Sequence, residues 1–434
     1  MVNRSERGLR TCSVPYSRMP AVSTTLQILV VGLNYRPEKT GVGPYTSEAA
    51  EMLAAHGHRV HVVTAYPHYP QWRFRPAGPE DDGDGRDLTV TRVRHQLPRR
   101  HTRLWRAWSE VTFGMRAVTT RWGSPDVVLL VSPALVSSAL VLLRARLSRR
   151  RPHVGLWIQD VYSKGVAELG GGSGSARLLA WIERRVAKAV DGVCVLHDGV
   201  ARIVVDEFGV PVDRVTVVRN WSRVEPAADV DRAEARRRLG WPSHWVTVLH
   251  SGALGAKQGM DTVVGAAELA ARSGSPVHFV VVGDGSARAG LQRRAAGLPS
   301  ITFVDPLDDD DYDLALAAAD VLLVNERPGL REMALPSKLT TYFNAGRPVL
   351  AATEVGSLTM KEIAASGGGI VVPPGIPEEL LAAAERLADD KTASAALGRR
   401  GREYCRAVLS RESSYERLAA WVAVLAGSDM ASCD

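Results

Sequence analysis

Cysteine is scarce in this chain, and none of it lies in a metal-binding or disulfide pattern. The 434 residues include four cysteines, and no two of them form a C-x-x-C pair. This spacing argues against a zinc ribbon and against a disulfide framework, and it fits a reducing compartment.

Long apolar runs and targeting signals are also lacking. The sequence has no run of 18 uncharged apolar residues, so it predicts no membrane-spanning helix. Residues 1–24 carry four arginines but no apolar segment, which excludes a secretory signal. We therefore expect residues 1–24 to be a disordered extension and the protein to be cytoplasmic.

The charge balance is moderately basic. Lysine and arginine number 54 against 47 aspartate and glutamate residues, which gives a formal net charge of +7. Such an excess favours an anionic partner, namely a membrane surface, nucleic acid or a phosphorylated substrate. The length and the 45% hydrophobic content predict a globular chain of two domains.

Apolar strand-like runs alternate with helix-like stretches along the whole chain. This alternation predicts an α/β protein with doubly wound parallel sheets. The pattern restarts near residue 246, after a polar stretch at 222–244 that we interpret as a hinge. The predicted strands are 27–33, 59–65, 127–131, 154–158, 192–196 and 215–218 in the first half, and 246–250, 277–282, 301–304, 321–324, 349–351 and 370–372 in the second.

Each half has a glycine-rich loop between its first strand and its first helix. The first loop contains Gly41 and Gly43, and the second contains Gly252 and Lys257. Backbone N–H groups at such a helix start bind anions, and a lysine there can neutralise a diphosphate. A tight strand-to-helix turn would explain the glycines equally well in the first loop, whereas Lys257 favours phosphate binding in the second.

The densest polar region lies between the predicted strands 321–324 and 349–351. It contains two acids, Glu326 and Glu332, and a Ser337-Lys338 pair. Pro336 and Ser337 predict the start of a helix whose N–H groups would face a ligand. Charged surface loops are common, but polar residues crowded after a strand end favour a binding site.

In their order and spacing, these motifs resemble the family 4 retaining glycosyltransferases, in the branch of colanic-acid and O-antigen enzymes. The resemblance covers about residues 26–427, and its matching segments are 32–38, 66–72, 157–160, 219–221, 251–252, 257–259, 282–285, 335–339 and 345–348. It implies a GT-B fold, in which two Rossmann-like domains face a central cleft. The implied domains are an acceptor-side domain at 25–222, a sugar-nucleotide domain at 223–405 and a C-terminal helix at 406–427 that packs back toward the first domain.

The resemblance also implies an activity and a set of site residues. The enzyme would move a sugar from a nucleotide-diphosphate donor, expected to be a UDP-sugar, to a hydroxyl of a glycan, lipid-linked or natural-product acceptor, with retention of configuration. Asp160 and Glu332 would act near the transferred sugar. The implied donor-binding residues are Gly41, Gly43, Asn220, Gly252, Lys257, Gly283, Ser337, Lys338 and Leu339.

The sequence departs from the family pattern at three positions. Ala253 replaces the usual arginine, Lys257 lies one position early, and the second glutamate of the E-x7-E element would fall near Thr341. Because of these departures, uridine as the base of the sugar donor is an expectation only.

No D-x-D motif lies in a donor-loop position, because residues 308–311 read as an acidic helix start. We therefore expect no metal and no cofactor beyond the sugar nucleotide. Helix N-termini and lysines would stabilise the departing diphosphate.

A basic stretch at 92–106 holds six arginines and Trp105. Arginine mixed with tryptophan suits an anionic membrane surface, so peripheral association at the inner face of the membrane stays open beside a solvated loop and helix face. Two other functions stay open: a sugar-nucleotide 2-epimerase of the same architecture, and a nucleic-acid-binding protein. The second rests on charge alone, without a recognition motif, so we expect no nucleic acid.

Overall fold

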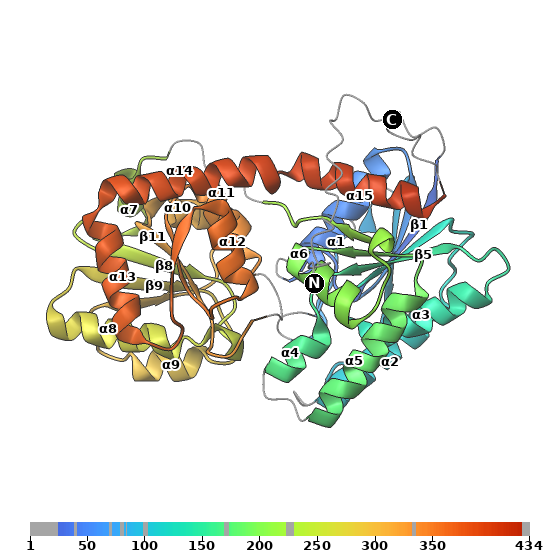
Figure 1. Ribbon diagram of the computed structural model, residues 1–434, viewed down its shortest axis with the longest axis horizontal. Helices are drawn as coiled ribbons and strands as arrows, with labels where there is room; N and C mark the ends of the chain where they lie inside the picture. The colour runs from blue at the N-terminus through green and yellow to red at the C-terminus, as the bar shows by residue number, and fades with distance from the viewer. Residues whose placement is uncertain are drawn as a thin grey trace, which may run out of the picture. The chain divides into compact units, whose positions relative to one another are not determined.

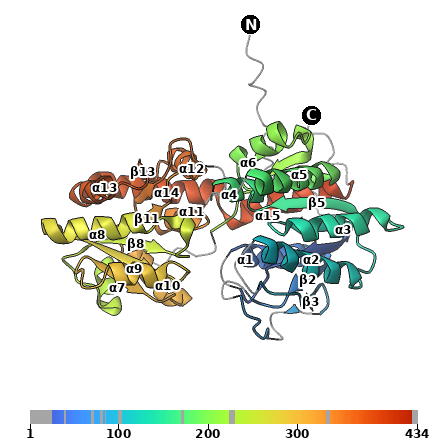
Figure 2. The ribbon, with the colours of Figure 1, turned by 90° about the horizontal axis from the view of Figure 1, so that it is seen from below.

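The computed structural model describes residues 25–38, 41–68, 72–78, 82–83, 85–98, 103–168, 173–222, 230–331 and 336–427. The chain forms two compact units. The first comprises residues up to Ala167, Gly171–Arg219 and the residues from Glu412 onward, and the second comprises Asn220–Arg411 together with residues 168–170. Each unit is a parallel sheet covered by helices on both faces (Figure 1, Figure 2). The predicted extension at 1–24 lies outside the described residues.

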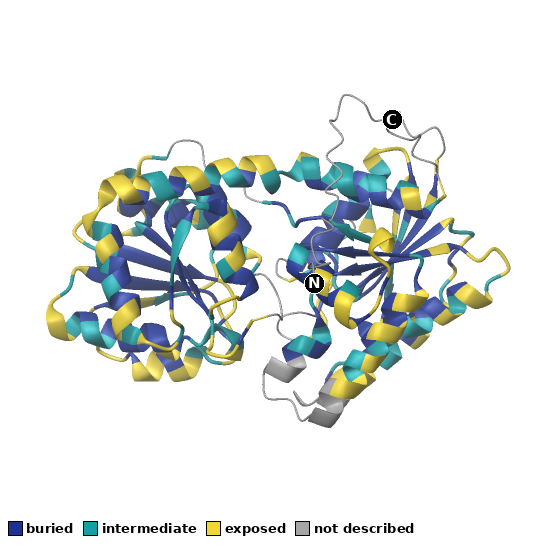
Figure 3. Ribbon diagram, viewed as in Figure 1, coloured by how far each residue is buried: buried dark blue, intermediate teal, exposed yellow. Residues whose placement is uncertain are grey.

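The first unit contains a seven-stranded parallel sheet in the order β3-β2-β1-β4-β5-β6-β7. Its central strands are buried, as continuous apolar runs in a sheet covered on both faces must be (Figure 3). The strands are β1 (Gln27–Val31), β2 (Arg59–Ala65), β3 (Leu88–Val93), β4 (Val127–Val131), β5 (His153–Ile158), β6 (Gly192–Val195) and β7 (Val215–Val217). All six predicted strands are confirmed, and β3 is an edge strand that the sequence analysis missed.

Helices cover both faces of this first sheet. They are α1 (Gly43–Ala55), α2 (Arg103–Thr119), α3 (Leu135–Leu147), α4 (Tyr162–Glu168), α5 (Ser173–Ala189), α6 (Asp198–Arg202) and α15 (Arg411–Leu425). Right-handed crossovers place α1 on one face and α2 and α3 on the other, because the chain leaves β1 toward β2 but leaves β3 and β4 in the opposite direction. Helix α15 joins α1, since the Tyr415 hydroxyl lies 3.2 Å from the Glu48 carboxylate.

Two strand glycines allow α15 to lie close to the first sheet. A Cβ on Gly155 would come within 2.6 Å of Leu425 Cδ1, and one on Gly192 within 2.8 Å of Leu425 Cδ2. Any larger side chain would push the helix away. The last described helix of the chain therefore packs on β5 and β6.

The second unit contains a six-stranded parallel sheet in the order β10-β9-β8-β11-β12-β13. Its strands are β8 (Val246–Ser251), β9 (Val277–Val282), β10 (Ile301–Val304), β11 (Val321–Asn325), β12 (Val349–Ala352) and β13 (Gly369–Val372), and they confirm the six predicted ones. Its helices are α7 (Arg232–Leu239), α8 (Asp261–Ser273), α9 (Arg288–Arg294), α10 (Asp309–Ala318), α11 (Lys338–Ala345), α12 (Leu358–Ser366), α13 (Pro377–Asp389) and α14 (Lys391–Val408).

The acidic run at 308–311 is a helix start, as predicted. The Asp308 side chain caps α10 by accepting a hydrogen bond of 2.9 Å from the Asp311 backbone N–H. Its carboxylates therefore lie in the first turn, where the helix dipole favours negative charge.

None of the helices in the described part of the chain combines the length and the apolar character that a bilayer crossing requires.

The predicted hinge at 222–244 is wrong over its described second half. Residues 232–239 form α7, and Ala235 of this helix is fully buried against Leu314 and Ala318 of α10. Residues 223–229 lie outside the described residues. The polar composition misled the prediction because α7 is attached by an arginine rather than by a broad apolar face.

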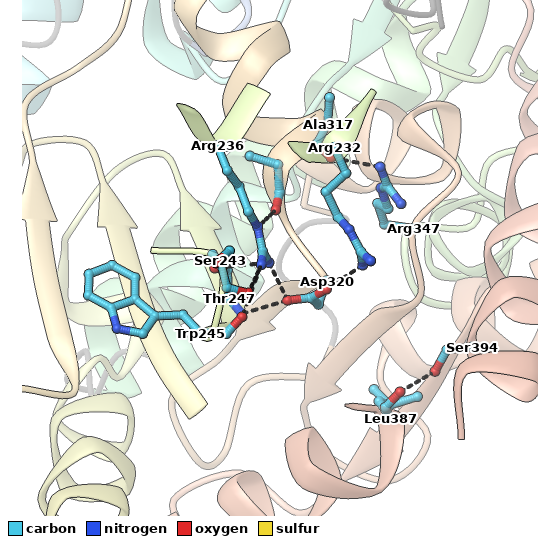
Figure 4. Close-up of polar contacts among 11 residues, drawn as sticks. Arg232, Arg236, Ser243, Trp245, Thr247, Ala317, Asp320, Arg347, Leu387 and Ser394 are labelled. Atoms are coloured by element: carbon cyan, nitrogen blue, oxygen red, sulfur yellow. Dashed lines mark hydrogen bonds and ion pairs between the residues drawn. The ribbon is translucent and has the colours of Figure 1, made fainter. Parts of the chain in front are cut away.

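That arginine is Arg236, which ties α7 to the amino ends of β8 and β11 (Figure 4). Its guanidinium forms an ion pair with Asp320 and donates hydrogen bonds to the carbonyls of Ala318, Ser243 and Trp245 at 3.0, 3.2 and 3.1 Å. Asp320 also accepts from the Thr247 backbone N–H at 2.8 Å. One buried cation thus satisfies several backbone carbonyls at once.

The basic stretch at 92–106 is not one continuous surface. Arg92 belongs to β3, forms an ion pair with Asp82 and donates to the Arg36 carbonyl at 2.9 Å. Arg106 lies on α2 with its guanidinium over the ring of Trp72. Arg92 therefore makes its ion pair and its hydrogen bond within the first unit.

We predict that Arg236→Ala destabilises the protein by about 3–5 kcal/mol, because it leaves a partly buried carboxylate and several carbonyls without their donor. The neighbouring Arg237→Ala is the control, since Arg237 is exposed and forms an ion pair with Glu234 on its own helix. It should change the free energy of unfolding by less than about 0.5 kcal/mol. Urea unfolding measures both, and equal effects would contradict this account of α7.

Candidate functional site

The strand order reverses between β8 and β11 in the second unit and between β1 and β4 in the first. Open parallel sheets bind ligands outside the carboxyl ends of their strands at such a reversal. In the second unit this edge carries the loop after β8, the loop after β9 and the start of α11. Six predicted site residues lie on these segments: Gly252, Lys257, Gly283, Ser337, Lys338 and Leu339.

The loops after β8 and β9 touch backbone to backbone. The Gly252 N–H donates to the Val282 carbonyl at 2.9 Å, and a Cβ on Gly283 would lie only 2.0 Å from the Gly252 oxygen. Gly283 also has φ +138°, a conformation that side chains rarely adopt. This contact therefore requires glycine at position 283. Gly252 is exposed and, having no side chain, presents its backbone as bare peptide.

Lys338, the first residue of α11, places its ammonium beside that bare peptide. A Cβ on Gly252 would lie 3.4 Å from Lys338 Nζ, and His250 Nε2 lies 3.2 Å from the same atom. Among the described residues the Lys338 ammonium makes no ion pair. In the described part of the chain, this edge of the sheet thus presents a cation that has no ion-pair partner.

Burial sets the protonation of both groups. Desolvation lowers the pKa of Lys338 to about 7, against the opposing influence of the Glu326 carboxylate. Burial, and then the nearby Lys338 charge, hold the pKa of His250 well below its ordinary value. His250 is therefore neutral and accepts a hydrogen bond from Lys338.

The start of α11 was predicted at Pro336-Ser337 and is confirmed. Ser337 is the exposed N-cap residue of this eight-residue helix. The N-terminal end of the helix dipole adds partial positive charge next to Lys338. The Leu339 side chain is buried in the core and its N–H donates to the Pro336 carbonyl at 3.0 Å, and its role in donor binding stays a prediction.

Two tyrosines that the sequence analysis missed anchor the loop after β8. The Tyr342 hydroxyl accepts from the Ser251 backbone N–H at 2.9 Å, and the Ser251 hydroxyl lies 3.0 Å from the Tyr312 hydroxyl. Tyr342 is fully buried one turn after Lys338 on α11. The spacing of four residues between them could have indicated that both side chains point toward the same loop.

Lys257 lies in a short 3₁₀ turn that is tied to the end of β11. Asn325 donates to the carbonyls of Gln258 and Gly259 at 2.6 and 3.0 Å, and the Arg327 N–H donates to the Lys257 carbonyl at 2.8 Å. The lysine side chain is half-buried. The structure thus puts Lys257 and Lys338 on the same edge of the second sheet.

The two acids predicted in this region are Glu326 and Glu332. Glu326 follows β11 and accepts hydrogen bonds from the hydroxyls of Thr353 and Thr359. It therefore holds the loops after β11 and β12 together. Glu332 lies outside the described residues.

In the first unit, Gly41 and Gly43 precede α1. Gly41 is exposed and has φ +71°, which explains a glycine there, and a Cβ on Gly43 would come within 3.3 Å of the Glu38 carbonyl oxygen. The tight-turn interpretation of this loop is therefore sufficient to explain both glycines, and a role in phosphate binding stays a prediction.

Asp160 lies two residues beyond β5 and is half-buried. Its backbone carbonyl accepts from the Ser132 hydroxyl at 3.2 Å, which links the carboxyl ends of β4 and β5. The pKa of Glu183 is raised chiefly by burial and also by the charge of the Asp160 carboxylate. Asn220 was expected to end a strand, but β7 stops at Val217, and Asn220 begins the second unit.

A second polar group at the carboxyl edge of the first sheet was not predicted. Glu38 accepts from the His68 backbone N–H at 2.8 Å and from Asn34 Nδ2 at 2.7 Å, and the rings of His68 and His95 lie 4.9 Å apart. Burial lowers the pKa of His95 to about 3, so this ring is neutral. His95 follows β3, and because that strand was missed, no sequence pattern placed His95 near His68.

Within the described residues, no group of three or more histidine, cysteine, aspartate or glutamate side chains is arranged to hold a metal ion.

Comparison with known proteins shows which protein families the chain matches. Residues 40–221 match the family described as "Glycosyl transferase 4-like domain", and residues 246–390 match "Glycosyl transferases group 1". The chain is 32% identical over 361 residues to the putative colanic acid biosynthesis glycosyl transferase WcaI of Escherichia coli K12, covering 77% of this chain and 86% of that protein. It is 30% identical to 2-deoxystreptamine glucosyltransferase of Streptomyces kanamyceticus, over 52% of this chain and 59% of that one.

Solved structures share the fold at low sequence identity. Sucrose-phosphate synthase from Thermosynechococcus elongatus superposes with a TM-score of 0.74 at 17% identity, covering 93% of this chain and 100% of the other. Anabaena HepE in complex with UDP-glucose gives 0.67 at 15% identity, covering 92% and 100%. Together with the two parallel sheets, these likenesses confirm the predicted GT-B fold class of two Rossmann-like domains.

Proposed function

Because the chain belongs to the family 4 glycosyltransferases, in the branch of colanic-acid and O-antigen enzymes, we propose that it transfers a sugar from a nucleotide-diphosphate donor to an acceptor hydroxyl. The observation that carries this proposal is the Lys338 ammonium beside the bare peptide of Gly252. The relatives are named as transferases, which favours sugar transfer over the 2-epimerase reaction.

The sugar donor binds through its diphosphate at the carboxyl edge of the second sheet. A diphosphate is anionic throughout the neutral range, and it meets Lys338, Lys257 and the N–H groups at the start of α11 there. The same groups stabilise the charge that grows on the diphosphate as the glycosidic bond breaks, so they contribute most in the transition state. A UDP-sugar is the expected donor, in keeping with the UDP-glucose that the fold neighbour HepE holds.

The sugar is transferred with retention of its anomeric configuration. In the proposed step the bond between the anomeric carbon and the phosphate oxygen breaks, the acceptor oxygen bonds to that carbon, and the departing phosphate takes the acceptor's proton. Asp160 and Glu332 position the sugar and stabilise its positive charge. The anomer of the product, measured by proton NMR, tests this assignment, and an inverted product would contradict it.

The acceptor is a hydroxyl of a glycan, a lipid-linked sugar or a natural product. Relatives named for colanic acid biosynthesis and for 2-deoxystreptamine glucosylation support these classes.

The affinity for UDP-glucose should depend on pH through Lys338. The anion favours the ammonium form, whose pKa is about 7 without ligand. Binding should therefore be nearly constant below about pH 7 and weaken about tenfold per pH unit above it, with uptake of up to one proton. Calorimetry from pH 6 to 9 in two buffers of different ionisation enthalpy measures both effects.

Two variants give this titration its controls. Lys338→Met should bind weakly and without the pH dependence, whereas Lys361→Met, at an exposed position on α12, should keep the wild-type profile. Wild-type affinity that stays level from pH 7 to 9 would contradict the role of Lys338.

The role of Asp160 in catalysis has a separate test. We expect Asp160→Asn to lower kcat for sugar transfer, or for donor hydrolysis when no acceptor is supplied, by about a hundredfold or more, because a charge that stabilises the transition state is lost. UDP-glucose binding and thermal stability should stay at the wild-type level. Asp213→Asn, at an exposed aspartate of the same unit, is the matched control, and full activity of Asp160→Asn would refute the assignment.

A further inference from the structure

The outer surface of helices α2, α3 and α5 in the first unit is basic. Its exposed cations include Arg106, Arg116, Arg177, Arg185 and Lys188, together with Arg146, which forms an ion pair with Asp191 just beyond the end of α5. These helices contain only two carboxylates, Glu110 and Glu183, and both are buried. Glu110 accepts from the Val136 N–H at 3.0 Å and Glu183 from the N–H groups that begin α4, so neither offsets the charge outside.

The same surface exposes large apolar side chains. Trp108 and Met115 of α2, Leu143 and Leu147 of α3, and Leu178 and Trp181 of α5 are each at least 50% exposed. The members of each pair are seven, four and three residues apart, so they lie on one side of their helix. Single exposed apolar residues are common, but a group of this size marks an interaction surface.

The three helices form one continuous face. Helix α3 packs against α2 on one side and against α5 on the other, and a Cβ on Gly114 of α2 would come within 2.8 Å of the Ser137 Cα of α3. Figures 1 and 2 show the three helices side by side on the same face of the first sheet, and Figure 3 shows their exposed outer sides. The apolar pairs therefore lie on neighbouring helices, with the cations among them.

We propose that this face of α2, α3 and α5 docks on a bilayer that contains anionic phospholipid. The apolar side chains would enter the boundary of the acyl chains, the tryptophan rings would lie at headgroup depth, and the arginines would contact lipid phosphates. Charge complementarity favours an anionic bilayer, because these helices expose no carboxylate that would repel the lipid phosphates. Exposed leucine and methionine do not suit nucleic acid, whose surface is charged and polar. This inference is independent of the proposed sugar transfer.

Co-sedimentation of the full chain with vesicles tests the proposal. The protein should bind phosphatidylcholine vesicles that contain about one third phosphatidylglycerol at least tenfold more tightly than vesicles of phosphatidylcholine alone, and salt should weaken this binding. Equal binding to both vesicle types, or none to either, would overturn the proposal. Binding of a double-stranded oligonucleotide in place of vesicles would overturn it in favour of nucleic acid.

Charge-reversal variants locate the surface. Each basic side chain near an anionic bilayer contributes about fivefold to partitioning, so three reversals should weaken binding by more than about a hundredfold. The test set is Arg116→Glu, Arg185→Glu and Lys188→Glu, and the control set on the second unit is Arg272→Glu, Arg293→Glu and Arg399→Glu. Both sets change the net charge equally, so equal losses would assign the binding to net charge and overturn the proposed face.

The tryptophans report insertion directly. Lipid brominated in its acyl chains should quench the fluorescence of the bound wild-type protein, and Trp108→Phe with Trp181→Phe should remove most of that quenching while binding persists. The serine pair at these positions should weaken binding severalfold, whereas Val355→Ser, at an exposed valine of the second unit, should not. Unchanged quenching in the phenylalanine pair would place the membrane contact elsewhere.

Discussion

The structure of the site depends on one charge, the ammonium of Lys338, which makes no ion pair with any of the described residues. Burying a lysine without an ion-pair partner is unfavourable, and desolvation accordingly lowers the pKa of Lys338 to about 7, against the opposing influence of the Glu326 carboxylate. Helix α11 is anchored in the core through Leu339 and Tyr342, and this anchoring fixes the position of Lys338, the first residue of the helix. His250 supplies a neutral acceptor rather than a carboxylate. Among the described residues no carboxylate pairs with this ammonium, so a ligand anion would complete it, and this is why the proposed function starts from it.

Backbone geometry supplies the other half of the site. Gly283 lets the loop after β9 touch the loop after β8, and Tyr342 fixes Ser251, so Gly252 stays bare and close to the ammonium. The arginine network around Arg236 holds the opposite, amino ends of β8 and β11. The amino edge of the second sheet thus holds a hydrogen-bonded ion pair, whereas the carboxyl edge carries the Lys338 ammonium. The basic and apolar face of α2, α3 and α5 is a separate feature of the first unit, and it would bring the enzyme to a surface rather than act on the sugar.

Much of the fold was predictable because buried parallel strands are continuous apolar runs, and all twelve predicted strands exist. The failures have physical causes. The edge strand β3 alternates threonine with apolar residues and pairs on one side only, so it resembled the loop before it. Helix α7 is held by Arg236 rather than by an apolar stripe, so it resembled a hinge. The start of α11 was predicted from Pro336-Ser337, but the contacts of His250, Tyr312 and Tyr342 join residues up to 91 positions apart and leave no local pattern in the sequence.

A crystal structure with UDP or an intact UDP-sugar tests the central claim most directly. The account predicts that the diphosphate lies at the carboxyl edge of the second sheet, with a phosphate oxygen within hydrogen-bonding distance of Lys338 Nζ and packed against Gly252. A nucleotide bound with its phosphates away from Lys338, or one that leaves this edge empty, would contradict the account.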